Sequence, residues 1–334
     1  GRAGGMEERV CSAHGIPFRP LPVEGWPRRK SPRRLWVALK LGMSLARSWM
    51  YLKKFAPQLV IGVGGYVSLP LVYVAQRMKI PTVIHEQNRL MGMANRMLAP
   101  RATRIYLSYE DTVGAYPKDR AQVVGNPVRA GFAAPPSRAE ALEQLGLDPA
   151  LPVVLAFGGS QGAQSLNRAM GGMVTAWSGA PIQVLWMTGN DYAAAARELA
   201  QNAPVATQVF AYIDDMVRAC VAADVIVSRS GASSTAEIAL IGKPSILVPY
   251  PHATDNHQEE NARTLEDAGG AVVLLDSECT AERLGDELRN LLTNRERMNR
   301  MGQAARRCAK PGAAEIMVAD MLSLVFESGE STPL

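Results

Sequence analysis

The chain has 334 residues, of which 47% are hydrophobic and 20% are charged, and its formal net charge is +5. This length favours two domains, each large enough to bury its own core, and the composition is typical of a globular protein. No apolar run approaches the length of a membrane span, which argues against a transmembrane helix. Four cysteines without pair spacing argue against a zinc site and indicate the reduced thiols of a cytosolic protein.

The net charge is divided unevenly along the chain. Residues 1–130 carry 21 basic and 7 acidic side chains, whereas residues 131–334 carry 15 basic and 24 acidic ones. No acidic residue lies between Glu24 and Glu86. This asymmetry predicts that the first half faces an anionic partner, which could be nucleic acid, a membrane surface or a phosphorylated substrate.

Near the N-terminus, two glycines, Gly4 and Gly5, directly precede Met6 and Glu7. This pattern is typical of the turn in a βα unit that runs into its helix, yet neither a strand nor an initiator methionine precedes it. We therefore expect that an N-terminal piece is missing from the sequence. Residues 16–23 predict a strand that prolines restrict to an edge or an irregular path.

Residues 31–54 predict an amphipathic helix with an unusual distribution of side chains. At about 100° per residue, one face is apolar and another carries a basic stripe. The apolar face consists of Leu35, Ala38, Leu39, Gly42, Ala46, Trp49 and Met50. The basic stripe consists of Arg33, Lys40, Arg47 and Lys54, with Trp36, Val37, Leu41 and Tyr51 on or beside it.

Two interpretations of this helix remain open. Apolar and aromatic side chains among lysines and arginines suit an anionic lipid surface, which makes the helix a candidate membrane-facing element. The alternative is a helix that packs on its own sheet and leaves the basic stripe in water. Nucleic acid is disfavoured as a partner because no helix-turn-helix, RNA-binding sheet or zinc signature accompanies the charge.

A series of βα units follows. Strands are predicted at 58–63, 81–84 and 102–107, and helices at 68–78 and 92–98. A polar loop that begins with His85 and Glu86 follows the second strand, and loops at the carboxyl ends of parallel strands can converge on one cleft. These two side chains are either an acid/base pair or a buried, hydrogen-bonded loop anchor, and we favour the anchor.

A second α/β series begins after a linker at 133–137. A strand at 153–157 leads into a glycine-rich turn at 158–163, which is a weak phosphate-cradle signal because such glycines also serve plain turns. Further strands are predicted at 183–187 and 205–210. The pair Asp214 and Asp215 is interpreted as the cap and first turn of a helix, in preference to a metal-binding acidic pair.

The stretch 223–262 carries the strongest functional pattern. A strand at 224–228 runs through a tight turn into a helix at 234–240, and another strand follows at 245–248. The backbone N–H groups of such a turn face an anion at the carboxyl edge of the sheet. Glu237, about one turn into the helix, is positioned to accept two ribose hydroxyls; the alternative is a capped structural helix with a solvated glutamate.

Three helices, at 280–292, 295–309 and 313–326, complete the chain. The residues alone therefore predict two tandem α/β domains with loops gathered at the strand ends. They also predict a cleft between the domains that binds an anionic nucleotide on its C-terminal side.

Six motifs in this order resemble those of the MurG family, the peptidoglycan glycosyltransferases that act on a lipid-linked acceptor. They are GlyGlyTyrValSer at 64–68, HisGluGlnAsn at 85–88, GlyAsnProValArg at 125–129, GlyGlySerGlnGlyAla at 158–163, IleAspAspMet at 213–216 and ArgSerGlyAla followed by Glu237 within 229–237. The resemblance spans nearly the whole chain, and the set is far more specific than any single loop.

The resemblance implies a GT-B fold, in which two Rossmann-like α/β domains face each other across a cleft. Residues 1–130 would form the acceptor- and membrane-facing domain, completed by the C-terminal helix at 313–330, and residues 131–312 would bind the UDP-sugar. Such enzymes transfer N-acetylglucosamine from UDP-N-acetylglucosamine to the 4-hydroxyl of the muramyl sugar on undecaprenyl diphosphate. The anomeric centre inverts, and no metal or other cofactor is needed.

The family also implies a place and partners. The chain is expected to be peripheral at the cytoplasmic face of the bacterial inner membrane. Its partners would be UDP-N-acetylglucosamine, the lipid-linked muramyl-peptide acceptor and the anionic membrane surface, with further proteins of cell-wall synthesis and no nucleic acid.

Individual roles follow from the matched motifs. The resemblance places Asn88 at the donor sugar, Arg129 and Ser160 at the nucleotide and its phosphates, and the backbone of Ile213 at the uracil. Gln258 would reach the sugar hydroxyls. The turn and helix start at the diphosphate would be Ala232, Ser233, Ser234, Thr235, Ala236 and Glu237, with the last of these on the ribose.

Two departures from the family pattern stand out. Ser233 and Ser234 replace a usual Leu-Thr pair, which keeps the turn small and hydroxyl-bearing. The family's first glycine-rich loop, which carries a histidine near the reacting centre, is expected to lie before Gly1. No catalytic base is therefore named, and the chain as given is expected to bind UDP-sugar but turn over poorly. Two alternatives stay open: a UDP-N-acetylglucosamine 2-epimerase, and a non-catalytic UDP-sugar-binding protein.

Overall fold

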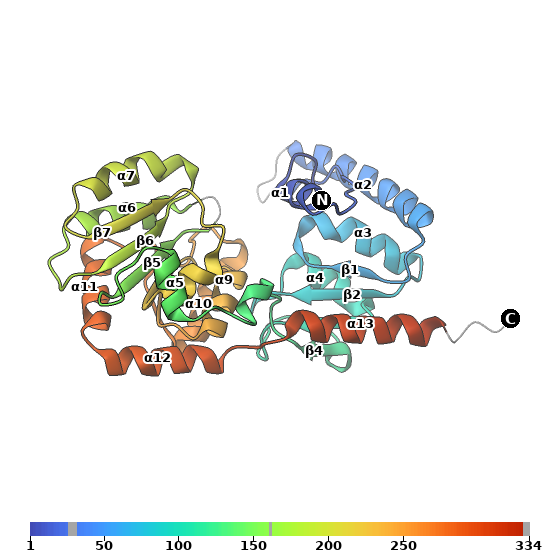
Figure 1. The fold of residues 1–334 in the computed structure, drawn as a ribbon. Coiled ribbons are helices and arrows are strands. Elements are labelled where there is room, and N and C mark those ends of the chain that lie inside the picture. Colours follow the sequence, from blue (N-terminus) through green and yellow to red (C-terminus); the bar gives the residue numbers. More distant parts are fainter. Residues whose placement is uncertain (26–31, 160–161, 330–334) are drawn as a thin grey trace. The chain divides into compact units, whose positions relative to one another are not determined.

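The computed structural model describes residues 1–25, 32–159 and 162–329. The chain divides into two compact units, Gly1–Gly125 together with Ala314–Leu334, and Asn126–Ala313 (Figure 1). Each unit contains its own parallel sheet with helices packed on it, so each is described by itself, as the N-terminal unit and the C-terminal unit.

The N-terminal unit contains a sheet of four parallel strands in the order β1-β2-β3-β4. The strands are β1 (Val60–Gly62), β2 (Thr82–Glu86), β3 (Arg104–Leu107) and β4 (Ala121–Val123), and the intervening helices are α3 (Gly65–Arg77) and α4 (Met93–Leu98). Alternate side chains of the strands enter different cores. Ile84 and Ile105 pack with α3 and α4, whereas Val83 and Tyr106 pack with Met317 of the last helix.

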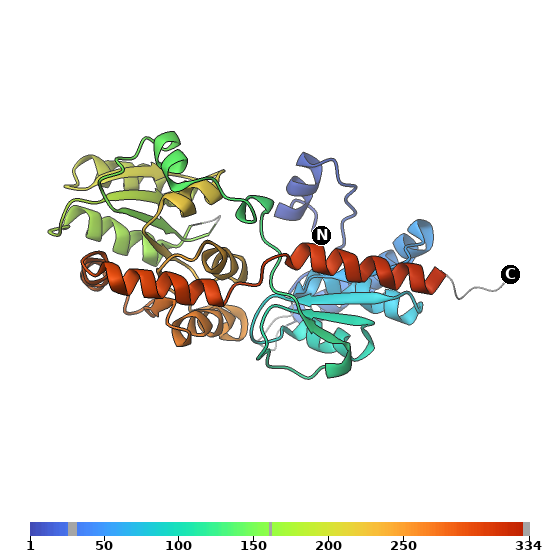
Figure 2. The same ribbon diagram turned by 60° about the horizontal axis from the view of Figure 1, so that its bottom comes forward.

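That last helix, α13 (Ala313–Gly329), runs along the N-terminal sheet in both ribbon views (Figures 1 and 2). Its Asp320 accepts two hydrogen bonds from the Arg104 guanidinium, at 2.9 and 3.1 Å, and one from the Tyr106 hydroxyl at 2.6 Å. Burial, reinforced by that hydrogen bond, raises the pKa of Tyr106. The polypeptide thus returns to its first unit through a charge-assisted network.

The N-terminal segment also contains α1 (Met6–Ala13) and α2 (Arg33–Phe55). The packed face of α2 is made of Val37, Ser44, Ser48 and Leu52. The apolar face predicted from the sequence points the other way: all seven of its members are exposed, among them Leu39, which is 55% exposed. The strand predicted at 16–23 does not form. The prolines of this segment have no backbone N–H to donate to a neighbouring strand, which explains its irregular path.

The C-terminal unit contains a sheet of six parallel strands in the order β10-β9-β8-β5-β6-β7. The strands are β5 (Val153–Phe157), β6 (Gln183–Met187), β7 (Ala206–Phe210), β8 (Val225–Ser228), β9 (Ser245–Leu247) and β10 (Ala271–Val273). The helices are α5 (Arg138–Gln144), α6 (Gln164–Thr175), α7 (Ala193–Gln201), α8 (Met216–Ala222), α9 (Ala232–Ile241), α10 (His257–Asp267), α11 (Ala281–Leu292) and α12 (Arg295–Arg307). The strand order reverses between β5 and β8, which is the switch point where open α/β sheets bind ligands.

Most predicted strands of both units form within two or three residues of their expected limits, and three differences bear on function. β2 extends through His85 and Glu86, so these residues belong to a buried strand and not to the loop after it. β4 and β10 were not predicted. None of the helices in the described part of the chain combines the length and hydropathy that crossing a bilayer requires.

Candidate functional site at the carboxyl edges of the sheets

The switch point of the C-terminal sheet is bordered by the turns that follow β5 and β8. In the first turn, a side chain on Gly158 would place its Cβ 2.4 Å from the backbone nitrogen of Ala163. Gly162 adopts a φ of +77°, and a Cβ there would lie 2.1 Å from the carbonyl oxygen of Thr188. Glycine is required at both positions because the backbone turns so tightly. Ser160, predicted at the phosphates, lies outside the described residues.

The helices that follow these two turns begin without a side-chain cap. Neither the N-cap of α6, Ala163, nor that of α9, Gly231, accepts a hydrogen bond from the first turn. By contrast, a side chain caps the starts of α5, α8, α11 and α12. The first-turn N–H groups of α6 and α9, like those of α7 and α10, therefore have no acceptor on an N-cap side chain, and such groups can bind anions.

Glu237 lies in the second turn of α9 and pairs with Arg129, which precedes α5. The Nε and a terminal nitrogen of Arg129 each donate to one carboxylate oxygen of Glu237, both at 2.9 Å. The Glu237 side chain is only 6% exposed, whereas that of Arg129 is 47% exposed. The paired hydrogen bonds to Glu237 raise the pKa of Arg129. Two residues that were predicted from separate motifs are thus joined in one bidentate pair.

A buried arginine that the sequence reasoning assigned only to a turn organises this edge of the sheet. Arg229, 7% exposed, directly follows β8 and donates to the carbonyl oxygens of Val248 and Pro249 at 3.0 and 2.9 Å. Its guanidinium also lies 2.6 Å from Asp276 and 2.8 Å from the Ser165 hydroxyl. The available signal was a charged residue at the end of an apolar strand, because such a residue is rarely buried without partners.

The remaining predicted residues of the C-terminal unit have partners within it. The Gln258 side-chain oxygen accepts from the backbone N–H of Tyr250 at 3.0 Å. Thr235 is buried, and its hydroxyl bonds to carbonyls of its own helix. The N–H of Ile213 points at the sulfur of Met187 at 3.2 Å. The carbonyl is therefore the backbone group of Ile213 that could contact a ligand. Ser233 is exposed, and Ala232, Ser234 and Ala236 are half-buried.

Only one residue of the acidic pair, which was predicted as a helix cap and first turn, is the cap. Asp215 is the N-cap of α8: its carboxylate accepts from the backbone N–H of Arg218 at 2.9 Å. Asp214 precedes the cap and lies outside the helix. No cluster of three His, Cys, Asp or Glu side chains that could hold a metal ion occurs within residues 1–25, 32–159 and 162–329.

In the N-terminal unit, Glu86 holds the loop after β2. One carboxylate oxygen accepts the backbone N–H of Asn88 at 3.1 Å, and the other accepts that of Gly92 at 3.0 Å and the Asn95 amide at 2.8 Å. Glu86 is 2% exposed. Asn88, predicted at the donor sugar, is half-buried, and its side-chain amide also reaches Glu86.

His85 is the buried anchor that we favoured over an acid/base role. Its Nε2 lies 2.9 Å from the carbonyl oxygen of Gly125 and therefore carries the proton, while Nδ1 lies 3.1 Å from the Gln87 amide nitrogen. Burial lowers the pKa of His85 below its ordinary value. A neutral imidazole with both nitrogens engaged inside the unit is suited to fixing the strand end.

Comparison with known proteins agrees with these features. The N-terminal domain of glycosyltransferase family 28 matches residues 1–107, and the C-terminal domain of the same family matches residues 153–317. The UDP-N-acetylglucosamine--N-acetylmuramyl-(pentapeptide) pyrophosphoryl-undecaprenol N-acetylglucosamine transferase of Halothermothrix orenii is 37% identical over 95% of this chain and 88% of its own length. The enzyme of the same name from Bacillus pumilus is 34% identical over 94% of this chain and 86% of its own length.

Solved structures show the same relationship. The crystal structure of Acinetobacter baumannii MurG has a TM-score of 0.78 and 28% identity, covering 96% of this chain and 89% of that one. A UDP-GlcNAc 2-epimerase from Neisseria meningitidis, bound to UDP-GlcNAc, has a TM-score of 0.64 over 95% and 89% of the two chains, but at 14% identity it shows a common fold only. The chain therefore belongs to the MurG family of glycosyltransferases, within glycosyltransferase family 28, and has the GT-B fold of two parallel α/β units.

Proposed function

We propose that this chain transfers N-acetylglucosamine from UDP-N-acetylglucosamine to the 4-hydroxyl of the muramyl sugar on undecaprenyl diphosphate, with inversion. The product is the lipid-linked disaccharide of peptidoglycan synthesis, on which cell-wall growth, cell shape and division depend. The observation that carries this proposal is membership of the MurG family over nearly the whole chain. The reaction class is the one named for the relatives.

The donor is held by the C-terminal unit in this proposal. The uncapped N–H groups at the start of α9, from Ala232 to Ser234, bind the diphosphate and offset its charge. The carboxylate of Glu237 has about four acceptor positions, of which Arg129 occupies two. The other two accept the ribose hydroxyls, so that the arginine orients the carboxylate without displacing the sugar.

Other residues position the donor through its loops. The carbonyl of Ile213 reads the uracil, and Ser160 contacts the phosphates. Gln258 bonds to sugar hydroxyls while holding the backbone of Tyr250. Asn88, fixed by Glu86, presents its amide to the donor sugar.

Product analysis tests the reaction. Purified protein is incubated with UDP-N-acetylglucosamine labelled in the sugar and with the lipid-linked muramyl-pentapeptide. We expect free UDP and a labelled lipid disaccharide to form together. Accumulation of UDP-N-acetylmannosamine would instead indicate that the protein is an epimerase. Tight UDP binding without any product would indicate a non-catalytic UDP-sugar-binding protein.

We further propose that α2 docks on the anionic inner surface of the plasma membrane, where the acceptor resides. Its apolar face is exposed, with Leu35 and Trp49 at 71% and 50%, and Trp36 beside the basic stripe is 57% exposed. The Lys53 ammonium lies 5.6 Å from the centre of the Trp49 ring. Exposed aromatic and basic side chains together favour a lipid interface.

The structure changes which basic residues are expected to contribute. Arg33 and Lys40 form ion pairs with Glu24, so their charge is already partly balanced. Arg47 and Lys54 are exposed, and neither has an ion pair among the described residues. They are the better candidates for attraction to lipid headgroups.

Vesicle sedimentation tests the docking. We expect Arg47→Glu with Lys54→Glu to weaken binding to phosphatidylglycerol vesicles by about tenfold or more, since each basic residue near the surface contributes about 1 kcal/mol. Arg168→Glu with Arg197→Glu, on exposed helices of the C-terminal unit, makes the same charge change as a control. Equal losses in the two variants would indicate a general charge effect and contradict docking through α2.

A further inference from the structure

A cavity of about 700 Å³ lies at the amino-terminal edge of the C-terminal sheet. Pro152 precedes β5, Asp224 precedes β8 and Pro244 precedes β9, and all three line the cavity together with helix α12. The residues proposed to hold the donor follow the carboxyl ends of the same strands. The cavity is therefore separate from the donor site, on the opposite edge of one sheet.

The lining of this cavity is strongly basic. Four cationic side chains reach it from three separate segments, and Asp224 is the one acidic member of the lining. The cations are Arg138, Lys243, Arg295 and Arg306. Their concentration contrasts with the chain from residue 131 onward, which has more acidic than basic side chains.

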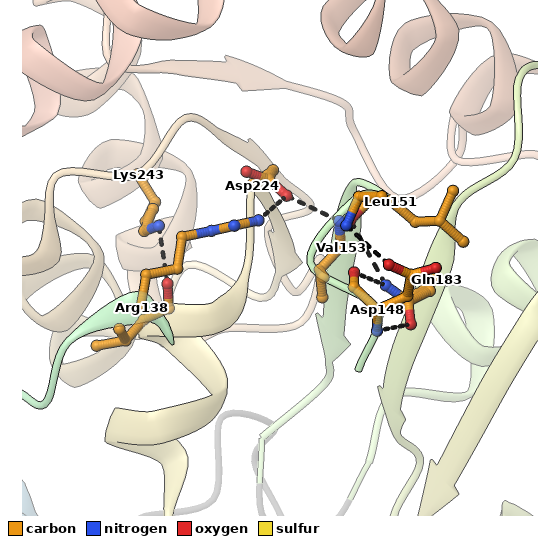
Figure 3. A network of polar contacts seen from close by, with 9 residues as sticks. Arg138, Asp148, Leu151, Val153, Gln183, Asp224 and Lys243 are labelled. Atoms are coloured by element: carbon orange, nitrogen blue, oxygen red, sulfur yellow. Dashed lines mark hydrogen bonds and ion pairs between the residues drawn. The ribbon is translucent and has the colours of Figure 1, made fainter. Parts of the chain in front are cut away.

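The acidic group is already engaged by two hydrogen-bond donors, and it is a single carboxylate facing four cations. Asp224 accepts one hydrogen bond from Arg138 at 2.7 Å and one from the backbone N–H of Val153 at 2.8 Å (Figure 3). The Lys243 ammonium has only a neutral partner in the structure, the carbonyl oxygen of Val221 at 2.9 Å. Burial lowers the pKa of Lys243, although the negative charge of Asp224 opposes the shift, so a further anion would stabilise the ammonium.

Arg138 and Arg306 each have N–H groups that form no hydrogen bond within the described part of the chain. The Arg138 side chain is 38% exposed and uses one terminal nitrogen to bond Asp224. Arg306 donates one terminal N–H to the carbonyl oxygen of Ile241 at 2.9 Å. A guanidinium has five N–H donors, so both retain capacity for an anionic ligand.

The cavity is preformed by close backbone packing. Gly242 adopts a φ of +66°, and a Cβ on Gly302 of α12 would lie 2.5 Å from the Gly242 carbonyl oxygen. This contact presses α12 against the turn that carries Lys243. Apolar side chains, Ile241 and Met298 among them, form the rest of the wall.

The spacing of the cations indicates how an anion would be divided. Arg295 and Arg306 lie on the same helix, about 16 Å apart along its axis at 1.5 Å per residue. Cations whose backbones are this far apart are suited to two separate anionic groups. A ligand with an anionic group at each end, and an uncharged body between them, matches this arrangement and the volume of a small-molecule site.

We propose that this cavity binds a small molecule that carries two phosphate groups on an uncharged body. Helix α9 begins at the proposed donor site and ends at Ile241 in the cavity wall, so both sites can be occupied at once. The proposal is independent of the reaction that the donor site performs.

Isothermal titration of the full chain with fructose 1,6-bisphosphate tests the proposal. UDP is titrated first and kept saturating, so that phosphates cannot bind at the donor site. We expect one bisphosphate per chain to bind under these conditions, and unphosphorylated fructose not to bind. If UDP itself fails to bind, the donor proposal is contradicted, and the bisphosphate titration is then run without it.

Matched double variants of α12 locate the binding. Arg295→Gln with Arg306→Gln removes two cavity cations, and we expect the bisphosphate to bind about tenfold more weakly or worse, because charge-assisted hydrogen bonds are lost. Arg300→Gln with Arg307→Gln makes the same charge change on the same helix outside the lining. Absence of binding to the unaltered chain, or equal weakening in both double variants, would overturn the proposal. Thermal melts of both variants exclude unfolding as the cause.

Discussion

The strand edges of the two units are held by single buried residues of opposite charge. Glu86 ends β2 and accepts hydrogen bonds from the N–H groups of Asn88 and Gly92. These backbone donors of the loop are therefore already bonded within the N-terminal unit. Arg229 follows β8 and instead binds the carbonyls of Val248 and Pro249. Helix α9, which begins just after Arg229, has no side-chain cap, so its first N–H donors are available for an anion. One edge is therefore suited to phosphate, and the other presents a side-chain amide.

The largest effect is expected from removing the buried cation. Arg229→Met leaves two carbonyls without a partner and Asp276 with only the Ser165 hydroxyl, and we expect the free energy of unfolding to fall by about 3–5 kcal/mol. Urea denaturation measures this loss, and UDP binding should disappear with it. Arg168→Met, at an exposed position, should change stability little. A stability loss no greater than that of the control would contradict the role of Arg229.

Removing the buried carboxylate tests the other side of the comparison. Glu86→Ala leaves two backbone N–H groups and the Asn95 amide without their acceptor, and we expect a loss of about 2–3 kcal/mol in the free energy of unfolding. UDP affinity should be unchanged, because the diphosphate is assigned to the other unit. A loss of UDP affinity in a folded Glu86→Ala protein would break the division of roles.

The donor carboxylate should have a similar or smaller effect, confined to binding. Glu237→Ala removes the acceptor of the ribose hydroxyls and the partner of Arg129, and we expect UDP affinity to fall by about 1–3 kcal/mol. Isothermal titration measures it, with Glu259→Ala, which removes a half-buried carboxylate that pairs with Arg263 in α10, as a comparison. Equal UDP affinity in Glu237→Ala and the unaltered chain would reject this role.

The smallest effect concerns pH and the N-terminal unit. Since burial lowers the pKa of His85, the unfolded chain binds its proton more readily than the folded one. The stabilising contribution is complete above the ordinary pKa of 6.5 and is lost as pH falls through the lowered folded value. We expect the urea concentration at the unfolding midpoint to decrease as the pH is lowered from 7.5 to 5. The decrease should be smaller in His85→Gln. His14→Gln, at an exposed site, should keep the original slope.

Local patterns were sufficient for much of the C-terminal unit. β5 and β6 occupy the predicted residues, because a continuous run of buried β-branched and aliphatic side chains is a strong signal for a central parallel strand. The glycine turn at 158–163 was equally visible, since only glycine tolerates the backbone found at Gly162. The edge strand β10 was missed, although β9 has the same length and was predicted.

The orientation of α2 shows where such patterns stop. Its hydrophobic periodicity located the helix, but the packed face contains Ser44 and Ser48, while Leu39 and Trp49 are exposed. Periodicity identifies an apolar face without saying whether protein or lipid covers it. Small side chains can instead be buried where a neighbouring helix approaches closely, as α3 does here.

By itself, the sequence determined the α/β class, the order of the strands along the chain, the glycine turns and the family. Tertiary structure alone decided that Arg129 pairs with Glu237, that Arg229 pairs with Asp276 and that cations converge on the cavity beside Lys243. The physical reason is range. Backbone conformation follows largely from neighbours a few residues away, whereas a charged side chain finds its partner only after the sheet has brought distant segments together.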